Sequence, residues 1–449
     1  MNANDLPERD LRVLWHPCTQ MHDHAKFPPI AIRRGEGVWL EDFDGKRYLD
    51  AISSWWVNLF GHANPRINAA IAAQANALEQ VILAGFTHAP IVELSERLLA
   101  LAPKGLARCF YADSGSAAVE IALKMSFHYW RNNGRPHKTR FVHLTNSYHG
   151  ETLGALAVGD LGLYKDIYAP LLLNTLCAPS PDTYLAQPGE TPADTARRAF
   201  AEMERLLQTH ADEVCAVIVE PLVQCAGGMR MYDPEYLRLL RAACDRHGVH
   251  LIADEIAVGF GRTGTLFACE QAGIAPDILC LGKGLTGGYL PLSACLVTDD
   301  IYDAFYAEYS ERRAFMHSHS FTGNPLACAA ALASLDIFEL DAVLTRNQKL
   351  AAAMWAACAP LREHPHVADV RARGMILAVE MVADKAQRTP YPWQERRGLR
   401  AYRYALTRGA LLRPLGDVLY LMPPYVVTED EIGFLAEVLK DAVAHATGE

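Results

Sequence analysis

The middle of the chain alternates short apolar runs with helical segments, and this pattern constrains the fold more than any other feature. The runs of strand type are Cys215–Glu220, Val249–Asp254 and Ile278–Leu281. Between the first two, a helix is predicted with Asp233 as its cap and Pro234 at its first position, ending at Gly248. Continuous apolar strands separated by helices are typical of a parallel sheet with helices on its faces. The predicted fold class is therefore α/β with a large, mostly parallel sheet.

Length and composition predict more than one domain. With 449 residues, the chain exceeds the size at which a single core stops growing. Near position 325 the sequence becomes Ala-rich and helical, over 325–340 and 347–361, and shorter strand-type runs follow at 375–382 and 418–422. We predict an N-terminal segment over 1–60 that packs with a small α+β domain over 331–449, and a large α/β domain over 61–330.

Local patterns predict several smaller elements. Alternating residues on either side of Asp44-Gly45 predict a hairpin over 38–50. Helices are expected over 64–83 and 91–101. The stretch 179–195 is rich in Pro, Thr and Asp, so a surface loop is expected there.

The net charge and the cysteine pattern limit which partners and which cellular compartment are expected. The net charge of −10 argues against nucleic acid or an anionic membrane as a partner. No apolar run approaches the roughly 18 residues of a membrane span, and the first residues lack the apolar core of a signal peptide. The eleven cysteines show no C-x-x-C spacing, which fits a reducing cytoplasm. The pairs His22/His24 and His317/His319 lack neighbouring ligands at metal-site spacing, so no metal is expected.

Lys283 follows the run Ile278–Leu281 and has glycines on both sides. A lysine at the end of a buried strand is costly unless its amine is used, because burial disfavours the charged form. The same desolvation makes lysine a good Schiff-base nucleophile. The alternative is a lysine in a tight turn whose amine reaches water.

Further polar groups are expected at the same edge of the sheet. Asp254 ends a strand, and ligands of parallel sheets lie beyond the carboxyl ends of the strands. The turn Asp113–Ser116 lies between a strand and a helix, a place suited to an anion, although a plain helix cap by Ser116 fits the same pattern. Pyridoxal phosphate requires an amine, a carboxylate against its pyridine nitrogen and a phosphate cradle. The sequence therefore predicts a pyridoxal phosphate site.

The loop Gly259–Gly264 matches G-x-G-x-x-G, a pattern associated with dinucleotide binding. Ile256-Ala257-Val258 separates it from the preceding strand, and no amphipathic helix follows it, so the context is wrong for that function. A nicotinamide oxidoreductase remains the hypothesis from a different class. A Walker A loop is not expected, because Gly282-Lys283 lacks the earlier glycine and the following Ser or Thr.

Asp254-Glu255-Ile256, the loop Gly259–Gly264 and Lys283 together resemble the signature of the class III aminotransferases, a family of fold-type I pyridoxal phosphate enzymes. Within this class, further segments resemble the branch that aminates 8-amino-7-oxononanoate to 7,8-diaminononanoate in biotin synthesis: Trp15-His16-Pro17, Ser53–Trp56, Ala112–Ser116, Gly227–Tyr232 and Leu421–Tyr425. The resemblance runs from about Leu14 to about Val427. It implies a homodimer with active sites at the interface and ping-pong transfer, with S-adenosylmethionine as the amino donor.

The resemblance also implies which residues serve the cofactor. Lys283 would bond to the cofactor aldehyde and then carry the proton between substrate and cofactor. Asp254 would pair with the pyridine nitrogen, and Tyr148 would stack on the ring. Gly115 and Ser116 would hold the phosphate.

A second group of residues would serve the substrate. Trp55 would wall the pocket, although the pattern alone fits a core position equally well. Arg413 would meet the substrate carboxylate as a bidentate partner, with Tyr420 near it. Glu151 would support the site from behind Tyr148.

The sequence departs from the family pattern at two places. Cys18 stands where the family usually has a tyrosine after Trp-His-Pro, which removes a ring and a hydroxyl from the substrate side. Ser318-His319-Ser320 replaces the family's Gly-Pro-Thr. Ser320 is expected to offer its hydroxyl to the cofactor phosphate of the neighbouring subunit, with His319 assigned to the cofactor and Ser318 to the substrate. This version resembles lysine-using relatives, so lysine is the alternative amino donor, and another ω-amine stays open as a donor or acceptor.

Overall fold

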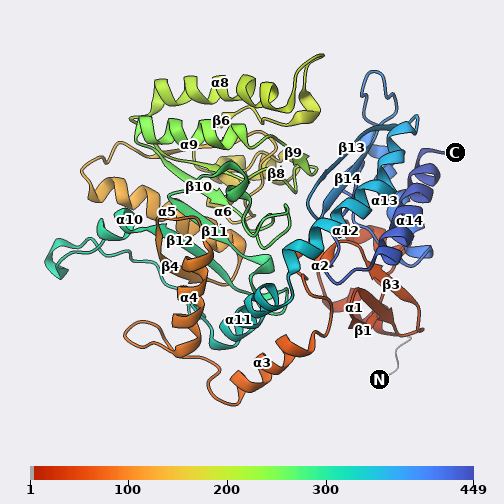
Figure 1. Cartoon of the computed structure of the whole chain (residues 1–449), viewed down its shortest axis with the longest axis horizontal. Coiled ribbons are helices and arrows are strands. Elements are labelled where there is room, and N and C mark those ends of the chain that lie inside the picture. Colours follow the sequence, from red (N-terminus) through yellow and green to blue (C-terminus); the bar gives the residue numbers. More distant parts are fainter. Residues whose placement is uncertain (1–4, 449) are drawn as a thin grey trace.

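The computed structural model describes residues 5–448, and the predicted N-terminal segment is therefore described from Asp5 onward. The chain forms a large lobe around one broad sheet and a smaller lobe that contains both the N-terminal strands and the C-terminal helices (Figure 1). In Figure 1 the red strands β1 and β3 lie beside the blue helices α13 and α14. The two ends of the chain thus meet in the smaller lobe. The domain limits near 60 and 330 remain predictions, because α11 (Pro325–Leu340) continues across position 330.

The large lobe contains a seven-stranded sheet in the order β4-β12-β11-β10-β7-β5-β6. All neighbours from β11 to β6 pair in parallel, whereas β12 pairs antiparallel with both β11 and β4. The mostly parallel sheet predicted from the sequence is confirmed. The strands are β4 (Leu106–Ala112), β5 (Arg140–Leu144), β6 (Leu176–Ala178), β7 (Val214–Val219), β10 (His250–Asp254), β11 (Ile278–Leu281) and β12 (Ser293–Thr298).

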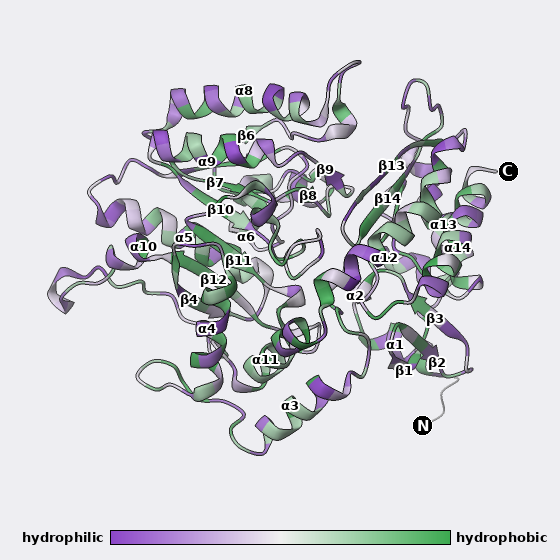
Figure 2. Ribbon diagram, in the orientation of Figure 1, coloured by the Kyte–Doolittle hydropathy of each residue, from purple (hydrophilic) through white to green (hydrophobic). Residues whose placement is uncertain are grey.

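Helices cover both faces of this sheet because its strands are apolar on both sides. Along β7, Val217 and Val219 pack into the core beneath α8 and α9, whereas Ala216 and Ile218 pack toward α5. Figure 2 shows the strands of this sheet mostly in green, whereas the outer helices mix green and purple residues. The helices of this lobe are α3 (Pro65–Ala75), α4 (Ala89–Leu101), α5 (Gly115–Asn132), α6 (Leu153–Ala157), α7 (Gly162–Lys165), α8 (Pro192–His210), α9 (Glu235–His247), α10 (Asp299–Asp303) and α11.

The smaller lobe is built on two sheets. One has the order β1-β2-β3-β15 and includes the predicted hairpin, and the other has the order β13-β14-β16. Their strands are β1 (Ile32–Glu36), β2 (Trp39–Asp42), β3 (Arg47–Asp50), β13 (Val367–Arg373), β14 (Ile376–Met381), β15 (Ala410–Leu411) and β16 (Val418–Leu421). The helices are α1 (Leu6–Val13), α2 (Ser53–Trp56), α12 (Val343–Cys358), α13 (Arg397–Thr407) and α14 (Glu429–Thr447).

Short elements complete the chain. A two-stranded ribbon pairs β8 (Val223–Gln224) with β9 (Arg230–Met231). The 3-10 turns are η2 (Met21–Ala25), η3 (Asp166–Leu171), η4 (Thr183–Leu185), η5 (Ala268–Ala272), η6 (Lys283–Thr286), η7 (Tyr309–Glu311), η8 (Ala359–Glu363) and η9 (Trp393–Glu395). Within residues 5–448, no helix is long and apolar enough to cross a membrane, and no group of three or more metal-ligating side chains occurs.

The structure corrects two local predictions. The helix predicted over 64–83 ends at Ala75. The following segment is held by Asn324, whose Nδ2 donates to Glu79 O, and by Gln80, whose Nε2 donates to Ser320 O, both at 2.9 Å. These tertiary bonds override helix propensity.

The stretch 179–195 is not simply a surface loop. Ser180 and Asp182 are buried, and α8 already begins at Pro192. The Ser180 hydroxyl donates to Gln224 Oε1 at 2.6 Å, which fixes the segment to the ribbon β8–β9. Thr191 and Asp194 form a capping box that starts α8. Proline and threonine in this stretch are thus helix-start signals as well as loop residues.

Candidate active site

The carboxyl ends of five strands meet at one edge of the large sheet. β4 leads to Gly115, β5 to Tyr148, β7 to Glu220, β10 to Asp254 and β11 to Lys283. The strands β10 and β11 are parallel neighbours with Asp254 opposite Cys280, so both strands deliver their polar residues to the same edge. The edge expected from the sequence therefore exists, with one more acidic residue than predicted.

Lys283 is partly buried and lies just beyond β11. Its backbone has φ +34°, an unusual conformation for a residue with a side chain. Its Nζ lies 5.2 Å from the centroid of the Trp56 ring. Burial lowers the pKa of Lys283, while the negative charges of Asp254 and Glu220 oppose this shift. This lysine therefore loses its proton more readily than a lysine in water, as a nucleophilic amine requires.

Asp254 is buried and tightly hydrogen-bonded. Its Oδ2 lies 2.7 Å from His149 Nδ1, and its Oδ1 accepts the Ile256 N–H at 3.1 Å. The other ring nitrogen of His149, Nε2, is buried without a hydrogen-bond partner among residues 5–448. His149 was not singled out from the sequence, although it follows Tyr148 directly. The pair fixes the direction of the carboxylate.

Glu220 is a second buried carboxyl group beside Asp254. Its Oε1 accepts the Tyr148 N–H at 2.9 Å and its Oε2 accepts the Cys225 N–H at 3.1 Å. Burial, together with the nearby negative charge of Asp254, raises the pKa of Glu220 well above its usual range. Glu220 was missed in the sequence, although it ends a strand just as Asp254 does.

The N-terminus of α5 forms a small cradle with the loop that follows Tyr148. Ser114 caps the helix by accepting the Ala117 N–H. The Ser116 hydroxyl lies 2.7 Å from Thr152 Oγ1 and accepts the Thr152 N–H at 3.1 Å. A Cβ at Gly150, where φ is +125°, would lie 2.3 Å from Ser116 Oγ. Glycine is therefore required for the loop to approach the helix end, where free N–H groups favour an anion.

Tyr148 and Glu151 form the far wall of the site. The Tyr148 hydroxyl donates to Glu151 Oε1 at 2.9 Å, and Cys18 Sγ lies 3.9 Å from the same oxygen. Tyr164 reaches Cys18 Sγ with its hydroxyl at 3.8 Å, and its ring centroid lies 6.0 Å from that of Tyr148. Burial raises the pKa of Tyr164 to about 12, so its hydroxyl stays protonated at neutral pH.

The adjacent residues Trp55 and Trp56 differ in exposure and in the groups that they contact. The four residues from Ser53 to Trp56 all have positive φ, which costs of order 1–3 kcal/mol per residue. The buried Asp50 carboxylate holds this turn through the Ser54 N–H at 2.9 Å and the Ser54 hydroxyl at 2.7 Å. Trp55 is 39% exposed at the cavity, whereas Trp56 is buried against Lys283. The sequence predicted Trp55 as a wall but did not single out Trp56.

Arg413 and Tyr420 approach from the smaller lobe. The Arg413 guanidinium lies over the Trp55 ring, with 4.4 Å between Cζ and the centroid, and has no hydrogen-bond partner within residues 5–448. The Tyr420 hydroxyl accepts the Trp56 indole N–H at 3.0 Å. Residues more than 350 positions apart thus complete one wall.

These groups surround a cavity of about 640 Å³. The predicted residues that line it are Cys18, Trp55, Tyr148, Glu151, Lys283, Arg413 and Tyr420. Gly115, Ser116 and Asp254 do not line it. A Cβ at Gly115 would lie 2.8 Å from Ile256 Cγ2, so Gly115 packs against the residues that follow Asp254. The unpredicted residues on its walls include Trp56, Tyr164 and the run Ala226-Gly227-Gly228.

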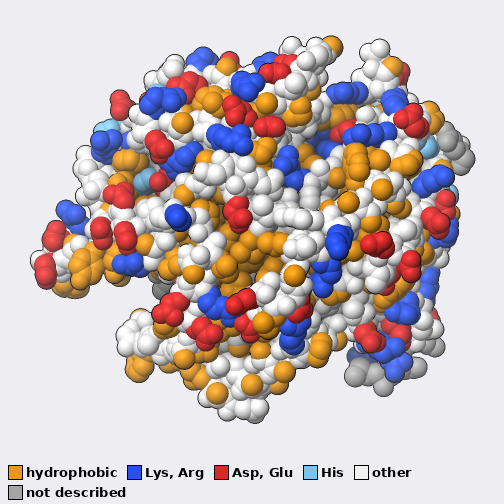
Figure 3. Space-filling model, in the orientation of Figure 1, with side chains coloured by type: hydrophobic (Ala, Val, Ile, Leu, Met, Phe, Trp, Pro, Cys, Tyr) orange, Lys and Arg blue, Asp and Glu red, His pale blue; other side chains and the backbone are white. Residues whose placement is uncertain are grey.

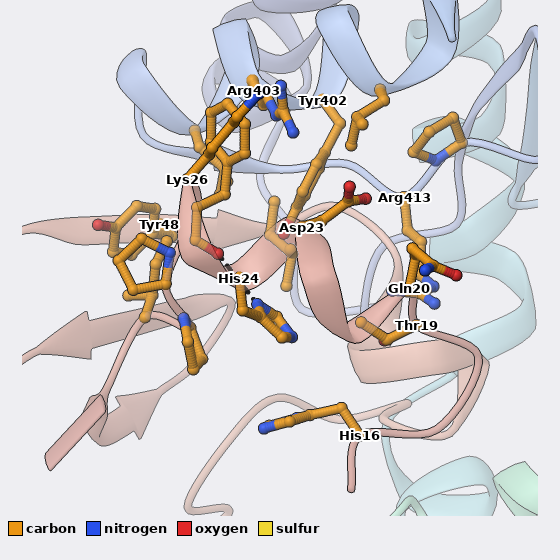
Figure 4. A pocket seen from close by; sticks show the side chains of 18 of the residues that line it. His16, Thr19, Gln20, Asp23, His24, Lys26, Tyr48, Tyr402, Arg403 and Arg413 are labelled. Carbon is orange, nitrogen blue, oxygen red and sulfur yellow. Dashed lines mark hydrogen bonds between the residues drawn. The ribbon is translucent and has the colours of Figure 1, made fainter. Parts of the chain in front are cut away.

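A second cavity of about 820 Å³ adjoins the first, and both are lined by Cys18, Arg413 and Pro414. Figure 4 shows Arg413 at its margin near Gln20 and Thr19, with Tyr402 and Arg403 entering from α13. Asp23 forms an ion pair with Arg396, and their Oδ1 and Nη1 atoms are 3.0 Å apart. Residues of the N-terminal segment therefore line this second cavity, which also borders Arg413.

The segment Ser318-His319-Ser320 lines neither of these cavities. His319 Nε2 lies 3.1 Å from Asp113 Oδ1, and Ser318 and Ser320 are exposed. The predicted contacts of this segment with cofactor and substrate stay predictions.

The loop Gly259–Gly264 serves a structural purpose that its glycines alone do not reveal. Arg262 is fully buried, and its guanidinium donates to the carbonyl oxygens of Pro423 at 2.8 Å and of Trp56 and Asn58 at 3.3 Å. It also lies 4.9 Å from the Tyr425 ring. The loop therefore anchors the two walls that carry Trp56 and Tyr420.

Comparison with known proteins decides the family. The model of the family "Aminotransferase class-III" matches residues 19–443. The chain belongs to the class III aminotransferases. It is 47% identical over 448 residues to the adenosylmethionine-8-amino-7-oxononanoate aminotransferase of Geobacter sulfurreducens, with 100% of this chain and 99% of the relative covered. It is 48% identical to the enzyme of that name from Helicobacter pylori, with 95% of each chain covered.

Solved structures of aminotransferases share the whole fold. The adenosylmethionine-8-amino-7-oxononanoate aminotransferase of Methanocaldococcus jannaschii superposes with a TM-score of 0.93 at 40% identity, covering 98% of each chain. The omega transaminase of Pseudomonas jessenii, solved in complex with PMP, has a TM-score of 0.94 at 30% identity, covering 99% of this chain and 98% of the other. The chain therefore has the fold-type I architecture predicted for it, and family membership gives no support to a nicotinamide oxidoreductase.

Membership in this class implies dependence on pyridoxal phosphate, and the residues at the sheet edge fit that cofactor. Lys283 offers an amine of lowered pKa, and Asp254 offers a buried, oriented carboxylate. The absence of a Cβ at Gly150 leaves the end of α5 accessible to an anion. Amine, carboxylate and anion cradle thus come from one edge of the sheet, as the cofactor requires.

Proposed function

We propose that this aminotransferase converts 8-amino-7-oxononanoate to 7,8-diaminononanoate, a step of biotin synthesis, with S-adenosylmethionine as the amino donor. The observation that carries the proposal is full-length identity of 47% to a relative of that name. The unpaired Arg413 at the cavity suits an acceptor that ends in a carboxylate.

Bound pyridoxal phosphate would supply an electron sink for the substrate carbon that loses its proton. Lys283 would hold the cofactor and then carry that proton at its Nζ, because burial keeps its amine readily deprotonated. Asp254, held by His149, would keep the pyridine nitrogen protonated. Gly115 and Ser116 would hold the phosphate, and Tyr148 would cover the ring.

The other cavity residues would bind the substrates. Arg413, flat against Trp55, would pair with the acceptor carboxylate, and Tyr420 would hold the neighbouring Trp56 in place. Within residues 5–448, Glu151 is the only carboxylate that lines the cavity. Both substrates carry a further cationic group, an amine on the acceptor and a sulfonium on the donor, so Glu151 is proposed to face it.

A homodimer with shared active sites is part of the proposal. Ser318-His319-Ser320 lines neither cavity of its own chain, and Ser318 and Ser320 are exposed, which leaves them available to a second copy. Ser320 and His319 would then contact the partner's cofactor and Ser318 the partner's substrate. All eleven cysteines are free, which agrees with the cytoplasm as the proposed compartment.

The direct test uses purified enzyme and separated half-reactions. The pyridoxal form should lose its visible absorbance when S-adenosylmethionine is added, and the pyridoxamine form should recover it with 8-amino-7-oxononanoate. Lys283→Ala should lose both the borohydride-reducible absorbance and turnover. If neither compound changes the absorbance of wild-type enzyme, the proposed substrates are wrong.

Lysine is the second candidate for the amino donor, and Cys18 favours it. A thiol in place of a tyrosine removes a ring that could stack on a nucleoside, while Glu151 remains 3.9 Å from the sulfur to face an ammonium. The same absorbance assay with lysine separates the two donors. Loss of absorbance with lysine but not with S-adenosylmethionine would assign lysine.

A further inference from the structure

A third cavity, of about 620 Å³, lies outside the active site and is rich in arginine. Residues of η4, β9, α12 and β13 line it, with Tyr232 and Asp233 just before α9. Figure 3 shows Lys and Arg side chains gathered between the region of β9 and that of β13. The charged residues that line the cavity are Arg362, Arg371, Arg373 and Arg388, with Asp233 and Asp369. This concentration contrasts with the net charge of −10 for the whole chain.

One of these arginines is already neutralised. Arg371 is buried, and its Nη1 donates to Glu380 Oε2 at 2.7 Å and to Asp369 Oδ2 at 3.1 Å. Asp369 is thereby engaged with Arg371. The remaining acid, Asp233, accepts the Glu235 N–H at 2.8 Å and acts on the cavity only at longer range.

The other three arginines have no carboxylate within 4.0 Å among residues 5–448. Arg362 donates from Nε and Nη2 to Val370 O at 3.2 and 2.7 Å, and Arg388 donates to the carbonyl of Tyr184. Arg373 donates from Nη1 to Gln271 Oε1 at 2.8 Å and from Nη2 to Tyr232 O at 3.2 Å, while its Nε is buried without a partner. Three guanidinium charges without an ion-pair partner therefore line one cavity, and a buried N–H without a partner, such as that of Arg373, is costly.

Aromatic rings set the positions of these cations. Arg362 lies 4.5 Å from the Trp355 ring, and Arg388 lies 4.8 Å from the Tyr184 ring. Cation–π contacts hold these guanidiniums in place, and their N–H groups that bond no protein atom remain available to a ligand. The arrangement suits an anion with several oxygens.

We propose that this cavity binds a small, multiply charged oxyanion, either a phosphate ester or a polycarboxylate. The ligand would pair with the charges of Arg362, Arg373 and Arg388, which come from separate segments of the chain, and would accept from their N–H groups that bond no protein atom. Arg371 connects the cavity to the active site, because its Nη2 donates to Gly228 O at 2.5 Å and Gly228 lines the catalytic cavity. The binding itself does not depend on which substrates the enzyme uses.

The test measures thermal unfolding of the cofactor-saturated enzyme at constant ionic strength with increasing pyrophosphate or citrate. A saturable rise in Tm is expected, because a ligand that binds only the folded state stabilises it by mass action. Arg388→Gln and Arg373→Gln should each weaken the apparent affinity at least about tenfold. Arg197→Gln, an ion-paired arginine on the surface of α8, is the matched control and should leave the affinity unchanged.

Arg413→Ala separates this cavity from the active site and should retain the rise in Tm. A preference for pyrophosphate assigns a phosphate ester, and a preference for citrate assigns a polycarboxylate. The proposal is overturned if neither anion gives a saturable rise, if Arg388→Gln and Arg373→Gln leave the apparent affinity unchanged, or if the rise disappears in Arg413→Ala. Arg388 is exposed, so Arg388→Gln is expected to fold.

Discussion

The guanidinium of Arg413 rests on the indole of Trp55, with 4.4 Å between Cζ and the ring centroid. Cation–π attraction holds the guanidinium at the ring, and its N–H groups make no hydrogen bond within residues 5–448, so they are available to a ligand. Arg413 follows β15 and Trp55 lies in α2, so the contact joins the C-terminal part of the smaller lobe to its N-terminal part at the substrate cavity.

Replacing this arginine should weaken binding of the acceptor. Arg413→Lys keeps the charge but removes the planar, bidentate edge, and KM for 8-amino-7-oxononanoate should rise about 10- to 100-fold, since a hydrogen bond to a charged group contributes about 1.5–3 kcal/mol. Steady-state kinetics with varied acceptor measure the effect. An unchanged KM would show that the carboxylate binds elsewhere.

Glu151→Gln should discriminate between amines by charge. The substitution keeps a hydrogen-bond acceptor for Tyr148 and removes the negative charge facing the cavity. Donors with a second positive charge should lose about tenfold in kcat/KM, whereas a donor with a single amine should lose little. Equal losses for both kinds of donor would point to a general structural role.

Gly150→Ala should damage cofactor binding. The new Cβ would lie 2.3 Å from Ser116 Oγ and 2.9 Å from Ser116 Cα, so the loop must retreat from the end of α5. The dissociation constant of pyridoxal phosphate should rise about tenfold or more. Gly105→Ala is the matched control: it also has positive φ, but no atom lies within 4 Å of its new Cβ. Equal effects in both variants would attribute the loss to backbone strain of about 1 kcal/mol alone.

Stability should fall in mild acid through buried histidines. Burial lowers the pKa of His250 to about 4 from the ordinary histidine pKa of about 6.5, so between these pH values the unfolded chain binds a proton that the folded chain does not. The free energy of unfolding is therefore unaffected by this histidine above about pH 6.5. Below that pH it declines by up to about 1.4 kcal/mol per pH unit as the pH falls toward 4. Burial lowers the pKa of His143 to about 4 as well, which adds in the same direction.

Chemical unfolding at pH 7 and pH 5 measures this loss. His250→Asn keeps a group near Nδ1 to meet the Ser126 hydroxyl, 2.9 Å away, and should reduce the difference between the two pH values by about 1–2 kcal/mol. His137→Asn, at an exposed position, should leave the difference as it is in the wild type. The same pH dependence in His250→Asn as in the wild type would contradict the assignment.

The sequence predicted the central sheet and its reactive edge because both follow from local rules. Apolar runs with intervening helices require a parallel sheet, and a parallel sheet brings Asp254 and Lys283 to one edge. Glu220 obeys the same rule and could have been found by it. The roles proposed for the individual site residues came from family resemblance and remain to be measured.

Other features depend on contacts between distant segments and leave no local signal. His149 is identifiable only once Asp254 is placed beside it at 2.7 Å. Trp55 and Trp56 are adjacent, yet only the left-handed turn held by Asp50 shows which indole meets Lys283. The helix expected over 64–83 stops early because Asn324 binds the backbone beyond it.

The hydrogen bonds of Arg262 to distant parts of the chain affect the order in which the protein folds during synthesis. Its guanidinium gathers carbonyl groups from Trp56 and Asn58 and from Pro423, about 365 residues later in the chain. During synthesis, the larger lobe can fold while the last strands are still inside the ribosome, but the pocket around Lys283 cannot close until they emerge. A nascent chain is therefore expected to gain its cofactor site late, almost at release.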